Sequence, residues 1–429
     1  MVRNREGERR VGVVVGTVVL ALLATASSAA ATTWSYEPLP SPPTSPVPQG
    51  QAQPSPEPQS VSCSSESSCT LVGEVPDANY PSSAVLPMAE HYDGSTWTVQ
   101  ALSGPPSHSM DQLDLSQLEL AGVSCPRSDF CMAVGSAPWN RNPDNFVERW
   151  AGSGWQLRLM PSMDNEQLKA ISCTSGKFCL AVTGGFRSEE WNGAGWRSVP
   201  RPSTFEPAQY GNAAGFTSVS CVSSTSCTAV GEAWNYENHA PVFSPFAEHW
   251  NGRAWELERV PYPAGAPFTS SAYLYGVSCT STNACTAVGE YVSGRRRTAA
   301  RTLAERWDGR RWAVQATPTP SLGSVTGTCF ASNPGSWGSQ PYCRGLSSVS
   351  CSSTRTCTAV GEFGLTADAP LAEQWNGRRW SLESTPTPVA TNDWELASVS
   401  CHSRVRCIAV GDYYTPPYGA GGAFAEERN

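Results

Sequence analysis

The chain has 429 residues and a formal net charge of −8, and it contains 37 Gly, 35 Pro, 16 Cys and 16 Trp, with only 15% charged residues. Low charge together with abundant Gly, Pro and Trp excludes a coiled coil or a helical bundle. The negative net charge disfavours nucleic-acid binding through a basic surface, so no nucleic-acid partner is expected. Sixteen cysteines, an even number, are typical of an oxidising compartment.

The N-terminal 31 residues have the pattern of a secretory signal peptide. A basic stretch (1–10) precedes an apolar run (11–26) and small residues up to Ala31. This order predicts cleavage near Ala31. The alternative is a membrane anchor, for which sixteen apolar residues are short. We therefore expect a mature chain (32–429) that is secreted, extracellular or associated with the cell envelope, with no membrane span. The excess of 27 Arg over two Lys favours a GC-rich bacterial source.

A cysteine motif recurs along the chain. Val-Ser-Cys, or a close variant, is followed by five residues, a second Cys and a run like Ala-Val-Gly. Structural zinc sites usually have cysteines two to four residues apart and two further ligands, so a disulfide within each pair is the better prediction and no metal site is expected. The two remaining cysteines, in the insertion 317–348, are expected to pair with each other. The predicted pairs are Cys63/Cys69, Cys125/Cys131, Cys173/Cys179, Cys221/Cys227, Cys279/Cys285, Cys351/Cys357, Cys401/Cys407 and Cys329/Cys343.

Each cysteine pair begins a unit of four predicted strands. Strand a ends at Val-Ser-Cys, and strand b is the run Cys-x-Ala-Val-Gly. Strand c leads into Asn-Gly or Asp-Gly, as in AEHWNGRAW (247–255), which is a strong hairpin signal because both residues tolerate positive φ. Strand d starts at Trp, alternates at strand period and ends at a Pro cluster. The units start at positions 61, 123, 171, 219, 277, 349 and 399.

Four short antiparallel strands, repeated about every 50 to 70 residues, predict an all-β, seven-bladed β-propeller that forms one domain over residues 32–429. The last unit stops at FAEERN (424–429) without a strand d, and residues 32–40 match a strand d without the rest of its unit. We therefore expect these two parts to complete the seventh blade, with 38–60 as a Pro-rich connection. The alternative is that 32–60 is only a linker.

The repeat resembles propeller families of the kelch and Asp-box (sialidase-repeat) type. Kelch units have a Gly-Gly doublet after strand b, which here occurs at Gly184-Gly185, whereas the other units have Gly and usually an acid. The Asp-box has the form Asp-x-Gly-x-x-Trp, and the segment from Asp93 to Trp97 lacks one spacer residue. The resemblance implies the architecture, and it carries over no active site.

Two sets of acidic residues also recur. The first lies two residues before the aromatic position of strand c, and seven equivalent copies around a ring favour a scaffold role, as hydrogen-bond acceptors at blade junctions, over catalysis. The second follows strand b; its members are expected at solvated strand ends, or alternatively form a partial carboxylate circle for a cation or a polyhydroxylated ligand. The first set is Glu90, Glu148, Glu189, Glu248, Glu305, Glu373 and Glu426, and the second is Glu74, Glu232, Glu290, Glu362 and Asp412.

Binding is expected on the face that carries the long and unequal b–c and d–a connections, since variable loops on a rigid scaffold usually bind ligands. Aromatic side chains there suit sugar stacking or protein contact, and a run of arginines suits an anionic group. The alternatives are that the aromatic residues only pack the loops and that the arginines are only solvated. The candidate ligand residues are Trp139, Trp234, Tyr236, Tyr275, Arg295, Arg296, Arg297, Trp337, Trp394, Tyr413 and Tyr414.

No catalytic motif or cofactor fingerprint occurs in the sequence, and the five histidines lack ligand spacing. We therefore expect a monomeric, secreted, non-enzymatic binding propeller without a cofactor, whose partner is an extracellular glycan or protein. One alternative is a structural envelope protein. The other is a glycoside hydrolase or lyase, which needs two close carboxyl groups; its candidate acids are Asp77, Asp144, Glu237, Asp368 and Asp393.

Overall fold

A computed structural model gives the fold of the chain. It describes residues 1, 33–40, 55–76, 85–103, 118–136, 145–160, 166–200, 213–237, 240–263, 271–293, 299–318, 345–364, 368–386, 393–414 and 421–429. Thr33–Asn429 forms one compact unit. The regular elements of the described residues are all β-strands, and none of these residues belongs to a helix that is long and apolar enough to cross a membrane. The predicted signal peptide lies outside the described residues.

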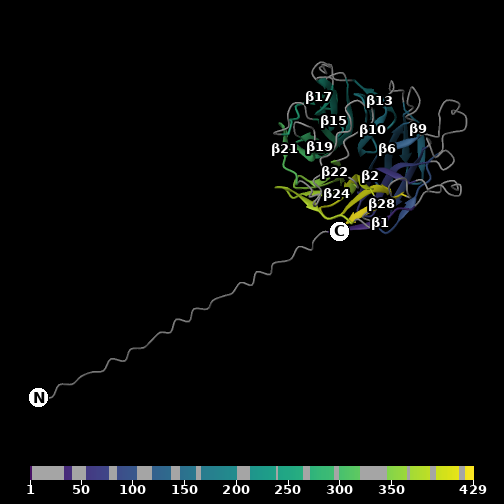
Figure 1. Ribbon diagram of the computed structural model, residues 1–429. Coiled ribbons are helices and arrows are strands. Elements are labelled where there is room, and N and C mark those ends of the chain that lie inside the picture. The colour runs from purple at the N-terminus through teal and green to yellow at the C-terminus, as the bar shows by residue number, and fades with distance from the viewer. Residues whose placement is uncertain are drawn as a thin grey trace. The chain divides into compact units, whose positions relative to one another are not determined.

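The strands form seven four-stranded antiparallel sheets, which confirms the seven-bladed propeller (Figure 1). Blades 1 to 3 are β2 (Glu57–Ser65), β3 (Ser68–Pro76), β4 (Val85–Tyr92), β5 (Trp97–Val99); β6 (Glu119–Arg127), β7 (Phe130–Ser136), β8 (Asn145–Trp150), β9 (Trp155–Leu159); and β10 (Leu168–Ser175), β11 (Phe178–Thr183), β12 (Ser188–Trp191), β13 (Trp196–Val199). Blades 4 and 5 are β14 (Ala213–Ser223), β15 (Ser226–Glu237), β16 (Ala240–Trp250), β17 (Trp255–Glu258); and β18 (Ala272–Ser281), β19 (Ala284–Ser293), β20 (Ala299–Trp307), β21 (Trp312–Gln315). Blades 6 and 7 are β22 (Leu346–Ser353), β23 (Thr356–Gly364), β24 (Asp368–Trp375), β25 (Trp380–Glu383); and β26 (Asp393–Cys401), β27 (Cys407–Tyr414), β28 (Gly421–Arg428) with β1 (Trp34–Pro38).

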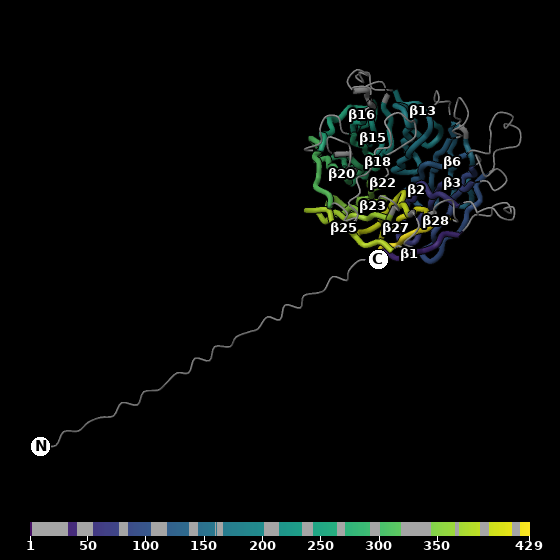
Figure 2. The backbone as a smooth tube through the Cα atoms, in the orientation of Figure 1, coloured from purple at the N-terminus to yellow at the C-terminus, as the bar shows by residue number. Residues whose placement is uncertain are grey.

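The seventh blade is closed by the N-terminal strand. Purple β1 lies beside yellow β28 in Figure 2, and the two strands pair antiparallel with Trp34 opposite Arg428. The Trp34 indole Nε1 donates a hydrogen bond to Glu383 Oε2 of the preceding blade at 3.1 Å. Three other blades use the same contact between the strand-d Trp and the end of the preceding strand d: Trp155 to Gln100, Trp312 to Glu258 and Trp380 to Gln315, at 2.7 to 2.9 Å. Trp34 therefore occupies the strand-d position that the sequence predicted.

The Val-Ser-Cys motif forms the seam around the centre of the ring. The first strands of neighbouring blades contact each other. At each junction the motif serine accepts a hydrogen bond from the backbone N–H of the first cysteine of the next blade, at 2.9 to 3.0 Å. These bonds make a closed circle because Ser400 of the last blade accepts from Cys63 of the first. The motif recurs because each copy supplies the donor of one junction and the acceptor of the next.

The hairpins at the c–d turns have the predicted geometry. Glycines at the second turn position adopt φ between 83° and 96°, a region that side chains other than glycine rarely adopt. In blade 4, Asn251 Oδ1 accepts the backbone N–H groups of Arg253 and Ala254 at 2.9 and 3.1 Å. The core lies between the blades: Val72 of blade 1, for instance, packs in one cluster with Phe146 of blade 2.

The seven predicted C-x5-C disulfides are all formed, one at the a–b hairpin of each blade. In each blade the disulfide holds the innermost strand to its neighbour. No free cysteine occurs in the described part of the chain. Cys329 and Cys343 lie outside that part, and their pairing stays a prediction. The confirmed pairs are Cys63–Cys69, Cys125–Cys131, Cys173–Cys179, Cys221–Cys227, Cys279–Cys285, Cys351–Cys357 and Cys401–Cys407.

The second cysteine of each pair also belongs to the core, a position that the motif spacing did not indicate. All seven are only 0 to 2% exposed, because the first residues of strand b lie between two blades. Thr70 Oγ1 of blade 1, for example, lies 3.8 Å from Cys131 Sγ of blade 2. These sulfurs therefore act as small apolar side chains as well as covalent links. The buried cysteines are Cys69, Cys131, Cys179, Cys227, Cys285, Cys357 and Cys407.

We expect each of these disulfides to contribute a measurable share of the stability. Replacing one pair, Cys279→Ala with Cys285→Ala, is expected to lower the free energy of unfolding by about 2 kcal/mol, because a closed loop this short still restricts the unfolded chain. Alanine avoids placing a hydroxyl group at the buried position of Cys285. Chemical denaturation of the oxidised protein measures the loss. Peptide mapping without reductant should recover each pair linked, and free thiols at several positions would contradict the disulfide framework.

Candidate functional site

Acidic side chains meet at the inner end of the blades on the face that carries the b–c and d–a connections, here named the loop face. They come from two places: the end of strand b and the start of strand a. In register, Glu57 lies opposite Glu74, and Glu395 lies opposite Asp412. We name the whole set the acidic mouth; its members are Glu57, Glu74, Glu119, Glu232, Glu290, Glu362, Glu395 and Asp412.

Glu290 and Glu362 are only 3% exposed, so the expectation that the acids after strand b lie at solvated strand ends is wrong for them. Burial and mutual repulsion make Glu74 and Asp412 hard to ionise. Burial, followed by the charges of Glu57 and Glu119, raises the pKa of Glu74 to about 7. Burial also raises the pKa of Asp412 well above its usual value, with further contributions from Glu395, Glu57 and Glu362. Like charges placed opposite each other on paired strands are destabilising, so the protonated forms of Glu74 and Asp412 are favoured.

Tyrosine side chains border the acidic mouth in blade 5. The Tyr275 hydroxyl donates a hydrogen bond to Glu290 Oε1 at 3.1 Å, and burial raises the pKa of Tyr275. The rings of Tyr273 and Tyr275 are stacked, with centroids 5.9 Å apart and 15° between their planes. Tyr273 also contacts Phe243 of β16, with ring centroids 4.9 Å apart. Tyr275, a predicted ligand residue, is thus half-buried beside the acids.

Trp394 does not occupy the exposed loop position that was expected from the sequence. It belongs to β26, where it lies opposite Tyr413, and only 2% of its surface is exposed. Its ring packs on Tyr413 at 4.4 Å and on Phe424 at 5.1 Å between centroids. Trp394 is therefore a packing residue, which was the alternative to ligand binding. It is buried because β26 extends further toward the loop face than the motif spacing indicated. Tyr413 is half-buried against Trp394.

The structure does not place the other predicted ligand side chains. The backbones of Trp234, Tyr236 and Tyr414 lie in the outward ends of β15 and β27, and their side chains are not described. Of the acids considered for hydrolysis, Glu237, Asp368 and Asp393 likewise have only their backbones placed. Residues outside the described ranges are Trp139, Arg295, Arg296, Arg297, Trp337, Asp77 and Asp144.

The three members of the acidic mouth that come from strand a were not predicted from the sequence. Glu57, Glu119 and Glu395 each stand four residues before the Val position of the cysteine motif. This regular spacing from the cysteine motif is the sequence signal that could have identified these three acids. It goes unnoticed because the other units have Gly, Gln or Tyr at this position, so that no acidic repeat stands out.

The strand-c glutamates face blade junctions rather than a site. All seven are 0 to 2% exposed, which agrees with a scaffold position. Glu189 accepts a hydrogen bond from the Ser198 hydroxyl, but Ser198 lies opposite it in the same blade, so this bond does not cross a blade junction as the expectation required. The expectation fails for Glu248 and Glu426, and likewise for Glu90 and Glu305, whose carboxyl oxygens have no hydrogen-bond partner among the described residues. Burial alone raises the pKa of Glu90 and Glu305 to about 8, so they are neutral at neutral pH.

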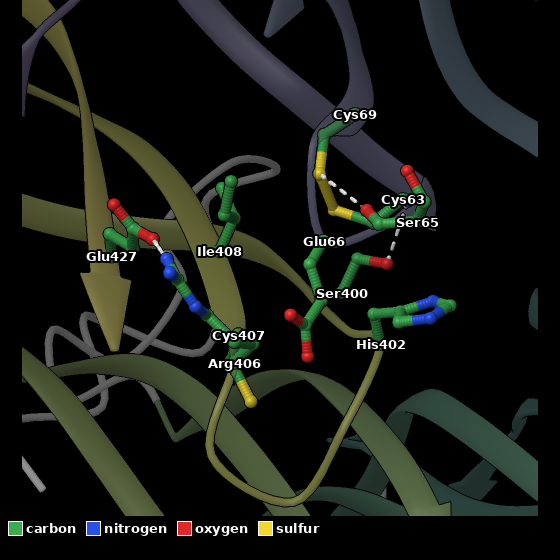
Figure 3. Close-up of a pocket in the computed structure, with 10 residues that line it drawn as sticks. All are labelled: Cys63, Ser65, Glu66, Cys69, Ser400, His402, Arg406, Cys407, Ile408 and Glu427. Carbon is green, nitrogen blue, oxygen red and sulfur yellow. Dashed lines mark hydrogen bonds and ion pairs between the residues drawn. A yellow bond between two sulfur atoms is a disulfide. The ribbon is translucent and has the colours of Figure 1, made fainter. Parts of the chain in front are cut away.

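A pocket on the opposite face lies between blades 1 and 7 (Figure 3). The Cys63–Cys69 disulfide, Ser400 and His402 line it, and Arg406 forms an ion pair with Glu427 at its side. Its volume is about 10 Å³, roughly the space that one water molecule needs. It has no room for an organic ligand. In the described part of the chain, no three His, Cys, Asp or Glu side chains are arranged to hold a metal ion.

The fold is similar to solved propellers of low sequence identity. Over 92% of this chain and 96% of the other, it superimposes on a structure described as YCF48 bound to D1 peptide, with a TM-score of 0.49 and 14% identity. YCF48 from Cyanidioschyzon merolae gives 0.48 and 11%, over 92% and 98% of the two chains. A chain of the Mitotic Checkpoint Complex gives 0.46 and 10%, over 97% and 99%. No protein-family model and no curated protein matches the sequence.

Proposed function

We propose that the protein is a non-enzymatic binding propeller that holds an extracellular protein partner on its loop face. The acidic mouth receives a basic side chain, Lys or Arg, that projects from this partner. The observation that carries the proposal is the set of opposed carboxyl groups whose pKa values burial and repulsion raise. An inserted cation relieves that repulsion, which neither a neutral group nor water does.

The chemistry of the mouth favours an organic cation over the other ligands considered. The carboxyl groups lack an arrangement for a metal ion within the described residues. A polyhydroxylated glycan is the second candidate, since the half-buried ring of Tyr275, which stacks on the buried Tyr273, lies beside the acids where a sugar can contact it. Seven disulfides in one chain support action in an oxidising compartment, as expected for a secreted protein.

The test uses an array of short synthetic peptides that each carry one Arg or Lys, paired with peptides in which Gln replaces it. We expect binding only to the basic member of a pair. Affinity should rise between pH 6 and pH 8, because the pKa of Glu74 is about 7, and it should fall with added salt. Glu74→Gln combined with Glu362→Gln should weaken binding about tenfold or more, as expected when close charge pairs are lost, whereas the exposed Glu256→Gln should not.

Two other outcomes would replace the proposal. Binding on a glycan array that is insensitive to salt and is lost with Tyr275→Ala would establish the glycan candidate instead. Turnover on a panel of chromogenic glycosides would show an enzyme, with its acids on the connections of the loop face. Both assays use the oxidised full-length mature protein.

A further inference from the structure

The face opposite the acidic mouth carries the a–b hairpins and the c–d turns and is here named the turn face. Exposed arginines gather on it over blades 4 to 7. The arc that they form stands out because the chain as a whole carries a net charge of −8. We name it the arginine arc; its members are Arg253, Arg310, Arg311, Arg378 and Arg379 of the c–d turns, with Arg355 and Arg404 of the a–b hairpins.

The turns of three successive blades hold the arginines in the same way. Asn251, Asp308 and Asn376 each accept two backbone N–H groups of their own turn at 2.9 to 3.1 Å. The glycine that follows each of them has φ of 88° to 91°. Because the backbone is equivalent in each blade, the first arginine after the glycine occurs at an equivalent place in each. The arginines therefore recur from blade to blade along the turn face.

Within the described residues the arc arginines form no ion pair, although the charge of Asp308 in the blade-5 turn partly offsets those of Arg310 and Arg311. The arginines of this face that have structural partners are different ones: Arg406 pairs with Glu427, and Arg306 donates to the backbone oxygen of Thr354 at 2.7 Å. Blades 1 to 3 lack such an arc among the residues placed there. Their c–d turns contain Asp93 or uncharged residues, and their exposed Arg127 pairs with Asp129 at 2.9 Å.

We propose that the arginine arc binds a linear polyanion, that is, an anionic polysaccharide whose sulfate, phosphate or carboxylate groups recur along the chain. Guanidinium groups bind such oxyanions with two parallel hydrogen bonds. A row of arginines repeated from blade to blade suits a ligand that is itself a repeat. The site lies on the face opposite the acidic mouth, so it is independent of the function proposed above.

The rest of the turn face favours a soluble polymer over a membrane or a single-stranded nucleic acid. Among the described residues, the large apolar side chain that is exposed at these hairpins is Val405, at 46%. Membrane-surface binding needs an apolar face that enters the lipid, and single-stranded nucleic acids need aromatic side chains on which bases stack. The arc offers charge beside one half-buried ring, Trp307, and has no row of exposed aromatic side chains and no broad apolar face among the described residues.

The test measures binding of the oxidised protein to heparin, a sulfated polysaccharide, by calorimetry at two salt concentrations. The triple variant Arg310→Ser, Arg378→Ser and Arg404→Ser removes one arginine from each of three blades. We expect the wild type to bind more weakly at higher salt and the arc variant to lose about tenfold or more in affinity, since each guanidinium contact with an oxyanion is charge-assisted. The matched control removes the same charge from exposed positions outside the arc and should lose little affinity; it is Arg127→Ser, Arg158→Ser and Arg259→Ser.

Three results would overturn the proposal. Equal losses in both variants would show that net charge alone attracts heparin. Binding to vesicles that contain phosphatidylserine, without binding to heparin, would show a membrane surface instead. The proposed site would also be refuted if the wild type does not bind heparin while its circular dichroism and melting temperature show that it is folded. The peptide affinity of the acidic mouth should stay unchanged in the arc variant, so the two proposals fail or succeed separately.

Discussion

Deleting the closing strand, residues 33–40, is expected to destabilise the entire propeller, although these residues are a small part of the chain. Trp34 is 7% exposed, and Tyr36 packs on Phe424 and Trp394 with ring centroids 5.7 and 6.0 Å apart. Truncating one large buried aromatic side chain usually costs about 3 to 5 kcal/mol. The deletion removes both aromatic residues and leaves the hydrogen-bonding edge of β28 unpaired.

The deletion also breaks a buried ionic contact. Glu383 accepts from Trp34 through one oxygen and from Arg428 through the other, at 3.1 and 2.8 Å. Arg428 is 1% exposed, and it stands where the other blades have an aromatic residue. The deletion thus removes one hydrogen-bond partner of the buried Glu383–Arg428 pair. Loss of a partner around buried charges is strongly destabilising.

Thermal unfolding and gel filtration of the deletion variant test the closure. We expect earlier unfolding and association through the free edge. Trp34→Ala should lower the free energy of unfolding by several kcal/mol, whereas Ser35→Ala, at an exposed position of the same strand, should change it little. A deletion variant that melts at the same temperature as the mature protein would show that the seventh blade does not need β1.

Raising the pH from 5 to 8 is expected to weaken the propeller through the strand-c glutamates. Burial raises the pKa of Glu90, Glu305 and Glu426 to about 8. An unfolded chain exposes these groups, and there they ionise near their ordinary value of 4.5. Between pH 4.5 and pH 8 the folded state therefore binds more protons than the unfolded state, and stability falls as pH rises.

The direction of this change in stability with pH distinguishes buried neutral glutamates from ion-paired acids, whose stabilising effect is lost at low pH. The contribution of a buried neutral glutamate to the free energy of unfolding is complete below its unfolded-state pKa. It decreases by about 1.4 kcal/mol per pH unit above that value and stops changing above the folded-state pKa. Several equivalent groups add to the slope. The acidic mouth acts in the same direction, since burial also raises the pKa of Glu74.

Denaturant unfolding at several pH values measures the effect. Glu305→Gln removes one titrating group that is fully buried. The free energy of unfolding of this variant should therefore fall less steeply between pH 5 and pH 8, by an amount that corresponds to up to about one proton. Glu256→Gln, an exposed change, should leave the slope as it is. A wild-type stability that rises over this range would contradict neutral glutamates at the blade junctions.

The fold was predictable because its determinants are local and repeated. Cys279 and Cys285 stand at a fixed spacing that suits a short hairpin, and the turn at Asn251 requires a residue such as Gly252 that tolerates positive φ. The closure was predictable because Trp34 begins a pattern that the last unit lacks. Each of these features depends on a few neighbouring residues, which a sequence displays directly.

The site was less predictable because it depends on contacts between strands and between blades. Nothing in the local sequence of Trp394 shows that its strand continues far enough to bury it against Phe424. The burial of Cys131 against the preceding blade is a contact of the same kind. The aromatic and basic loop residues were visible in the sequence, but their sequence positions did not determine what they face.

The measurement that tests the binding mechanism most directly is the number of protons released when a basic peptide binds. Calorimetric titrations at neutral pH in two buffers with different enthalpies of ionisation give this number. A cation in the acidic mouth lowers the pKa of Glu74 and its neighbours, so we predict that binding releases protons and that Glu74→Gln with Glu362→Gln reduces the release. Binding of the same peptide with no proton exchanged, and with the variant unaffected, would show that the ligand does not enter the acidic mouth.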